Sequence, residues 1–176
     1  MKVFINPGHG YPDPGAVNYQ FNLTEEQVAF EVGDMLEEYL KVAGVQVVGN
    51  LQSDDLCKVV DEANASGANL FVSIHCNSYS NPNAEGTEVL VYQLGGKSEV
   101  AAESILYQII AELGTVDRGV KERPRLYVLN RTDMPAVLVE MAFISNEDDI
   151  QLLLEKREEF AKAIARGITD YQLQVE

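Results

Sequence analysis

Short apolar runs alternate with amphipathic segments along almost the whole chain. The apolar runs predict strands at residues 2–5, 45–48, 70–76, 87–92, 126–129 and 136–140. A helical period in the other apolar positions predicts helices from 22–24 to 42, and over 56–63, 98–113, 150–154 and 155–171. This alternation predicts an α/β fold: a single domain over residues 1–176, with a twisted, mostly parallel (mixed) sheet flanked by helices on both faces.

The run 70–76 is the predicted central strand. Because side chains alternate along a strand, Phe71, Ser73 and His75 share one face, while Ile74 and Cys76 take the other. Cys76 therefore points away from its neighbour His75. This argues against a catalytic Cys–His pair made from these two residues.

The chain has only two histidines, and each follows the end of a predicted strand. His75 closes the central strand. His9 follows the first strand, within a segment, 6–15, whose three glycines and three prolines predict a loop of fixed shape. Ligands of open α/β sheets bind at the carboxyl ends of the strands, and imidazole is the commonest metal ligand. The two histidines therefore predict a metal site at this edge.

Two carboxylates, Glu25 and Glu140, lie at the boundaries of predicted elements, as the two histidines do. Glu25 precedes the buried stripe of the first predicted helix by one turn, where a charge needs a partner. Asn22-x-x-Glu25 also approximates a capping box, so the helix alone leaves its role open. Glu140 closes the strand 136–140. It has two interpretations, a catalytic carboxylate or a buried ion pair with Arg125 or Arg131.

Two imidazoles, one carboxylate and an open fourth position for water form a common catalytic zinc site. His9, Glu25 and His75 supply such a set from distant segments, which differs from the helical His-x-x-x-His arrangement of other zinc hydrolases. Glu140 is then free to act as general base on the zinc-bound water.

Composition and charge narrow the range of functions. The net charge is −15, with 13 Lys and Arg against 28 Asp and Glu, which argues against nucleic acid and anionic membranes as partners. The chain has no run of 18 apolar residues, so no transmembrane helix is predicted. The two cysteines, Cys57 and Cys76, have no metal-site spacing. One basic cluster is either a solvated loop or a rim for an anionic substrate; it comprises Arg118, Lys121, Arg123 and Arg125.

Five segments of the chain carry a resemblance to a known family. They are Asn6-Pro7-Gly8-His9-Gly10, Leu23-Thr24-Glu25, Ser73-Ile74-His75-Cys76-Asn77, Pro135-Ala136-Val137-Leu138-Val139-Glu140 and Phe143-Ile144-Ser145-Asn146. In order and separation they resemble the zinc-dependent N-acetylmuramoyl-L-alanine amidases of bacterial cell-wall turnover. The chain departs from the family pattern at Asn6, where Asp is common, and at Cys76, where Ala is usual.

The resemblance implies a role for each matching residue. His9, Glu25 and His75 are implied as ligands of one Zn²⁺ per chain, and Glu140 as the catalytic glutamate. The implied reaction is hydrolysis of the amide between N-acetylmuramic acid and L-alanine in peptidoglycan. We expect a monomer, and Asn77 and Arg125 are predicted substrate contacts.

The expected place of action is the bacterial cell wall. Met1-Lys2 leads directly into a short apolar strand without a signal-peptide core, so release by another route, or removal of a leader, is expected. The sequence does not distinguish a bacterial autolysin from a phage endolysin. Three other functions remain open: a zinc peptidase or deacetylase, a cell-wall-binding module that does not cleave, and a Cys–His hydrolase.

Overall fold

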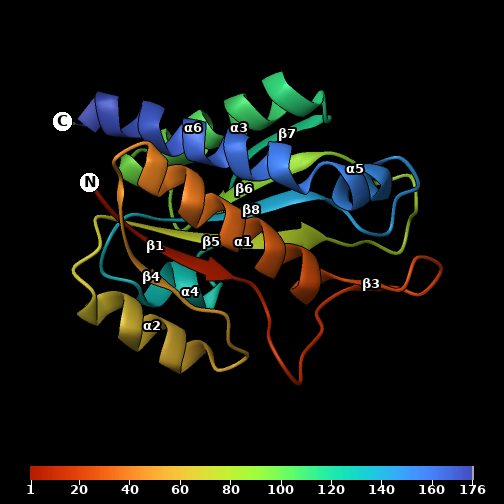
Figure 1. Cartoon of the computed structure of the whole chain (residues 1–176), viewed down its shortest axis with the longest axis horizontal. Helices are drawn as coiled ribbons and strands as arrows, with labels where there is room; N and C mark the ends of the chain where they lie inside the picture. Colours follow the sequence, from red (N-terminus) through yellow and green to blue (C-terminus); the bar gives the residue numbers. More distant parts are fainter. Residues whose placement is uncertain (176) are drawn as a thin grey trace.

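A six-stranded sheet forms the middle layer of the protein (Figure 1). The computed structural model describes residues 1–175. The strands lie in the order β4-β1-β5-β8-β6-β7, and every neighbouring pair is parallel except β6 and β8. Their bounds are β1 (Lys2–Pro7), β4 (Gln46–Asn50), β5 (Leu70–Asn77), β6 (Thr87–Val91), β7 (Asp117–Glu122) and β8 (Ala136–Phe143). The predicted mixed, mostly parallel sheet is confirmed.

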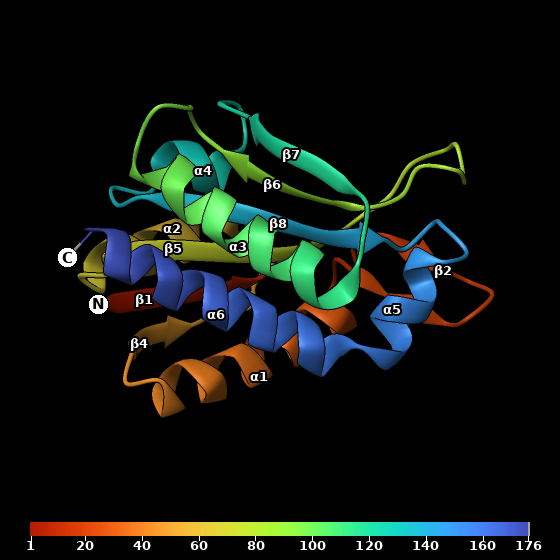
Figure 2. The same ribbon diagram turned by 90° about the horizontal axis from the view of Figure 1, so that it is seen from above.

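Helices cover both faces of the sheet, as predicted (Figures 1 and 2). Helices α1 (Glu25–Val42), α3 (Lys97–Leu113) and α6 (Arg157–Val175) bury one apolar core. The shorter α2 (Leu56–Ala65) and α4 (Tyr127–Arg131) bury a smaller core on the other face. The remaining elements are a two-stranded hairpin and a short helix: β2 (Val17–Asn18), β3 (Leu23–Thr24) and α5 (Asp149–Glu155).

The helices of this structure are not membrane spans. Across residues 1–175, each one is too short or too polar to traverse a lipid bilayer. This agrees with the sequence, which offers no apolar run of that length.

Three local predictions are wrong. Residues 117–122, which lie in the segment predicted as a loop with the basic cluster, form the edge strand β7. The sequence of β7 is polar and has no alternation of apolar and polar residues, so it carries no strand pattern. Residues 126–129, predicted as a strand, lie largely in α4, because so short an apolar run does not distinguish helix from strand. Strand β8 continues to Phe143, so Glu140 lies within the strand and not at its end.

The helices α3 and α6 approach each other closely at one glycine. A Cβ added at Gly167 of α6 would lie 2.4 Å from the Cα of Ile105 and 2.9 Å from the backbone oxygen of Ser104. Both are backbone atoms of α3, so a rotamer change cannot relieve the contact. Gly167 therefore sets the distance between the two helices that cover this face.

We expect Gly167→Ala to destabilise the fold by about 1–2 kcal/mol. Overpacking costs about 1–3 kcal/mol, and the backbone contacts at Gly167 favour the upper part of this range, which exceeds the gain of about 1 kcal/mol in helix propensity. Urea unfolding measures the change, and Arg166→Ala, at an exposed position of the same helix, should stay within about 0.5 kcal/mol of wild type. A Gly167→Ala protein as stable as wild type would contradict the close packing.

Candidate metal centre

Three side chains from distant segments meet at the carboxyl ends of β1 and β5. One ligand atom from each of His9, Glu25 and His75 lies within 4.8 Å of the other two. Glu25 lies between the histidines: its Oε2 is 3.1 Å from His9 Nε2, and its Oε1 is 2.8 Å from His75 Nδ1. The structure thus brings together the three residues that the sequence predicts as ligands.

The loop after β1 holds His9 in an uncommon conformation. The Gly8 N–H donates to Ile74 O at 2.8 Å, which ties the loop to β5. Gly10 and Asp13 exchange two backbone hydrogen bonds, of 3.1 and 2.7 Å, and close a turn. Directly before this turn, His9 has a φ of 63°, in the left-handed region that few non-glycine residues adopt.

Two glycines leave the space that the three side chains occupy. A Cβ at Gly8 would lie 2.3–2.6 Å from the ring of His75. A Cβ at Gly15 would lie 2.6 Å from both Glu25 Oε2 and His9 Cδ2. The glycines of this loop therefore allow its backbone to pass directly over the site.

The two interpretations of Glu25 are separated by its contacts. Thr24, not Glu25, caps α1, because Thr24 Oγ1 accepts from the Gln27 N–H at 3.3 Å. The Glu25 carboxylate is only 5% exposed and accepts from the backbone N–H groups of Ala16 at 2.9 Å and Cys76 at 3.1 Å. It is a buried acceptor within the cluster.

Electrostatics in the metal-free protein favour a charged pair. Burial alone would raise the pKa of Glu25, but hydrogen bonds from His75 and His9 hold that pKa well below its usual range. The hydrogen bond to Glu25 is the main reason that the pKa of His9 is raised to about 9, against the opposing effect of burial; Asp13 adds to the rise. Glu25 is thus ionised and available as a ligand.

Glu140 lies on the neighbouring strand, opposite His75 in the register of β5 and β8. Burial is the main cause that raises its pKa to about 7. Within residues 1–175, its Oε2 is the one buried side-chain oxygen or nitrogen that has no hydrogen-bond partner. The ion pair with Arg125 or Arg131 considered from the sequence does not form.

A second buried carboxylate follows in the same row. Glu88 of β6 lies opposite Glu140. Arg118 Nε donates to Glu88 Oε2 at 2.9 Å, and Lys121 Nζ donates to the same oxygen. Asn77 Nδ2 donates to Glu88 Oε1 at 3.3 Å. Half of the basic cluster therefore neutralises a buried carboxylate, and the predicted substrate contact Asn77 is bound to the same group.

A cavity of about 200 Å³ opens beside the two histidines. His9, His75, Leu56, Leu126 and Tyr127 are among the residues that line it. The cavity brings polar ligand atoms and an apolar wall together, as small-molecule sites commonly do.

The predicted contact Arg125 is exposed and lies in an adjoining depression of about 240 Å³. Arg123, Pro124 and Leu126 line it too. Because Leu126 borders both hollows, Arg125 lies at the rim of the cavity beside the histidines.

The cysteines do not form a catalytic pair with either histidine. Cys76 is buried in the core, and burial is the main reason that the pKa of its thiol is well above the usual value. Cys57 is exposed, and its Sγ lies 3.3 Å from the Tyr127 hydroxyl, not beside an imidazole. The Cys–His alternative therefore has no geometric support.

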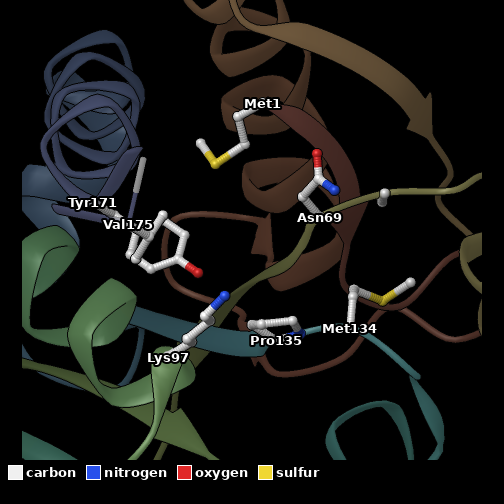
Figure 3. A pocket seen from close by; sticks show the side chains of 8 residues that line it. Met1, Asn69, Lys97, Met134, Pro135, Tyr171 and Val175 are labelled. Carbon is white, nitrogen blue, oxygen red and sulfur yellow. The ribbon is translucent and has the colours of Figure 1, made fainter. Parts of the chain in front are cut away.

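A larger cavity of about 390 Å³ lies at the opposite edge of the sheet (Figure 3). Figure 3 shows the Lys97 amine and the Tyr171 hydroxyl pointing toward each other there, while Met1 and Met134 line other parts of the cavity. Among residues 1–175, no histidine or carboxylate side chain lines it. Because ligands bind at the carboxyl ends of parallel strands, we place the candidate site at the histidines instead.

The sequence interpretation missed the partners of the ligands. Asp13 Oδ2 lies 2.8 Å from His9 Nδ1, and Ser73 Oγ lies 3.1 Å from His75 Nε2. Ser73 precedes His75 by two residues on one strand. Because side chains two residues apart lie on the same face of a strand, the sequence could have predicted this contact. Asn6, whose Oδ1 accepts from Ser73 at 2.8 Å, comes from another strand and gave none.

The residues present suit a divalent metal. Two imidazole nitrogens and a buried, ionised carboxylate converge, and the partnerless Glu140 lies beside them. This donor set, with room for water, is one that catalytic zinc uses.

The chain is similar to one known family over nearly all of its length. The family described as N-acetylmuramoyl-L-alanine amidase matches residues 3–170. The N-acetylmuramoyl-L-alanine amidase LytC of Bacillus subtilis is 35% identical over 177 residues, which are 96% of this chain and 35% of LytC. The chain spans about a third of the length of LytC and about half the length of a relative from Clostridium perfringens.

Solved structures agree with this match. The catalytic domain of CwlV, an N-acetylmuramoyl-L-alanine amidase from Bacillus (Paenibacillus) polymyxa var. colistinus, superposes with a TM-score of 0.89 at 31% identity, covering 99% of both chains. An N-acetylmuramoyl-L-alanine amidase from Clostridium difficile 630 superposes with a TM-score of 0.92 at 27% identity, covering 99% of this chain and 98% of that one. Both also confirm the α/β fold.

We expect Glu25→Gln to weaken zinc binding by more than about 100-fold, because losing a hydrogen-bond partner of a ligand already costs about 10–100-fold. The neutral amide loses the charge that faces both histidines. Isothermal titration measures affinity and stoichiometry. Glu26→Gln, one residue along the same helix, is the matched control and should bind one zinc as wild type does. Equal affinity in both variants would remove Glu25 from the ligand set.

Proposed function

Since the chain belongs to the N-acetylmuramoyl-L-alanine amidase family, we propose that it hydrolyses the amide between N-acetylmuramic acid and L-alanine in peptidoglycan. We further propose that His9, Glu25 and His75 hold one Zn²⁺ and that Glu140 is the catalytic carboxylate. Residues 1–176 would act as a single catalytic domain.

One observation carries the proposal. A buried carboxylate oxygen without a hydrogen-bond partner, Oε2 of Glu140, lies on the strand beside a converging His–Glu–His set. A buried polar atom without a partner is destabilising, so it persists where function requires it. A module that only binds the cell wall would have no use for this group.

The metal and the protein have separate tasks. When bound, zinc supplies a Lewis acid that polarises a carbonyl and lowers the pKa of a water from 15.7 to about 7. His9 and His75 would hold it with neutral imidazole nitrogens. Glu25 would hold it with an oxygen that two backbone N–H groups already orient.

Glu140 would move the proton in both halves of the reaction. As the water oxygen bonds to the lactyl carbonyl carbon, Glu140 takes the water proton. It then passes this proton to the nitrogen of L-alanine as the C–N bond breaks. The products are a lactyl carboxylate on the glycan and a stem peptide with a free amino group. A single carboxylate thus serves as base and then as acid.

The rest of the site suits a cell-wall substrate. The cavity beside the histidines adjoins the depression at Arg125, because Leu126 lines both. Arg125 and Asn77 remain our proposed substrate contacts, because stem peptides carry carboxylates and amides that such groups bind. Peptidoglycan is the proposed partner, the bacterial cell wall the proposed place of action, and a monomer the proposed active form.

Digestion of purified peptidoglycan tests the reaction. We expect new amino groups on L-alanine when the zinc-loaded protein is added. They should be absent after treatment with a chelator and return with added zinc. Labelling of the new amino groups, followed by identification of the terminal residue, gives the readout. New amino termini at another residue would show that the protein is a zinc peptidase and not an amidase. Unchanged cleavage in the presence of the chelator would exclude a metal-dependent reaction.

We expect Glu140→Gln to lower turnover by at least about 100-fold while zinc stays bound, because general acid–base catalysis contributes roughly 10²–10⁴-fold. The amide keeps the shape of the side chain but cannot accept the proton. Glu147→Gln, at an exposed position after β8, is the control. A Glu140→Gln protein that hydrolyses peptidoglycan at the wild-type rate would refute this assignment.

A further inference from the structure

Each candidate histidine ligand has its second ring nitrogen occupied by a different group. His9 faces Glu25 with Nε2 and Asp13 with Nδ1, at 3.1 and 2.8 Å. His75 faces Glu25 with Nδ1 and Ser73 with Nε2, at 2.8 and 3.1 Å. The two rings therefore present opposite nitrogens to the shared carboxylate.

The direction of the hydrogen bonds at His75 follows from Asn6. Its Nδ2 donates to two backbone carbonyls, those of Leu51 at 2.9 Å and Pro7 at 3.2 Å, and carbonyls only accept. The amide orientation is thereby fixed, and Asn6 Oδ1 is the atom that faces Ser73, at 2.8 Å. Because Oδ1 can only accept, the Ser73 hydroxyl donates its one proton to it.

Ser73 is left with lone pairs toward the ring. Its Oγ therefore accepts from His75, and the proton must be on Nε2. Once a metal takes the place of the hydrogen bond between Nδ1 and Glu25, a neutral ring with its proton on Nε2 offers the metal the lone pair of Nδ1, the atom that faces Glu25. Asn6 and Ser73 thus select one tautomer and one ring orientation.

Burial limits what else these two residues could do. Ser73 is 0% exposed, and Asn6, which lines the cavity beside the histidines, is 3% exposed. The amide of Asn6 is taken up by hydrogen bonds, so neither residue offers the cavity a free polar group. Asn6 lies on β1 and Ser73 on β5, paired in register, so the sheet itself holds them beside His75. Their polar atoms are used entirely within this chain of hydrogen bonds.

We propose that Asn6 and Ser73 are positioning residues that make His75 a ligand through Nδ1, while Asp13 makes His9 a ligand through Nε2. This inference rests on the zinc site proposed above. The positions of the partners in the sequence explain why the two histidines use opposite ring nitrogens. Asp13 is four residues from its histidine on a loop, whereas Ser73 is two residues from its histidine on a strand.

Zinc titration of Ser73→Ala tests the role of the hydroxyl. The variant leaves the Nε2–H of His75 and Oδ1 of Asn6 without partners, so we expect zinc affinity about 10–100-fold weaker than wild type, as for other outer-shell losses. Ser104→Ala on α3 removes a hydroxyl that bonds only within the helix and to Gln174, and it should bind zinc normally. Thermal unfolding of both metal-free variants compares their folding.

The outcomes separate this inference from the proposed metal site. Wild-type protein that fails to bind zinc would refute the metal site and with it this inference. Zinc-binding wild type with a Ser73→Ala affinity within twofold of it would refute only the positioning role. Weakened binding in a folded Ser73→Ala protein, with Ser104→Ala unchanged, supports it.

The ring nitrogens can be observed directly, without any variant. In the zinc-loaded protein labelled with ¹⁵N-histidine, two-bond and three-bond ¹H–¹⁵N correlations report which nitrogen carries the proton. We expect one ring protonated on Nδ1 and the other on Nε2, a result that needs no assignment because the chain has two histidines. Two rings with the same tautomer would overturn the proposal. In Ser73→Ala, the Nε2 proton should exchange faster with water.

Discussion

The buried carboxylate of Glu25 is the constraint on which the rest of the site depends. An ionised carboxylate withdrawn from water is stable only if charges and hydrogen-bond donors replace the solvent. Here two histidines and two backbone N–H groups do so, and they come from three separate segments. The loop after β1, the hairpin before α1 and the end of β5 must therefore meet at one point.

The sheet makes this meeting possible. Strands β1, β5 and β8 are parallel neighbours, so their carboxyl ends lie along one edge, and Asn6–Ser73 and His75–Glu140 face each other in register. Helices α2 and α4 pack over Phe71 and Leu138 on this face. Four residues after Phe71 on β5, the cavity opens beside His75. The same strands thus supply a packed core at one end and the candidate site at the other.

Much of the fold follows from periodicity, because apolar burial is strong in the central strands and long helices. The errors fall where the sequence pattern is weak: β7 is a polar edge strand, and α4 has five residues, too few to show a helical period. The edge at which His9, His75 and Glu140 gather was predictable from strand order along the chain. The partners of the ligands were not, because the contact of Asn6 with Ser73 depends on which strands pair. The roles of Glu25 and Glu140 stay predictions that their buried contacts support.

X-ray absorption at the zinc edge of the loaded wild-type protein tests the central claim most directly. The account predicts one zinc per chain with imidazole nitrogen and oxygen neighbours at about 2.0–2.1 Å. A sulfur neighbour at about 2.3 Å, or a zinc without imidazole scattering, would contradict a centre built from His9, Glu25 and His75.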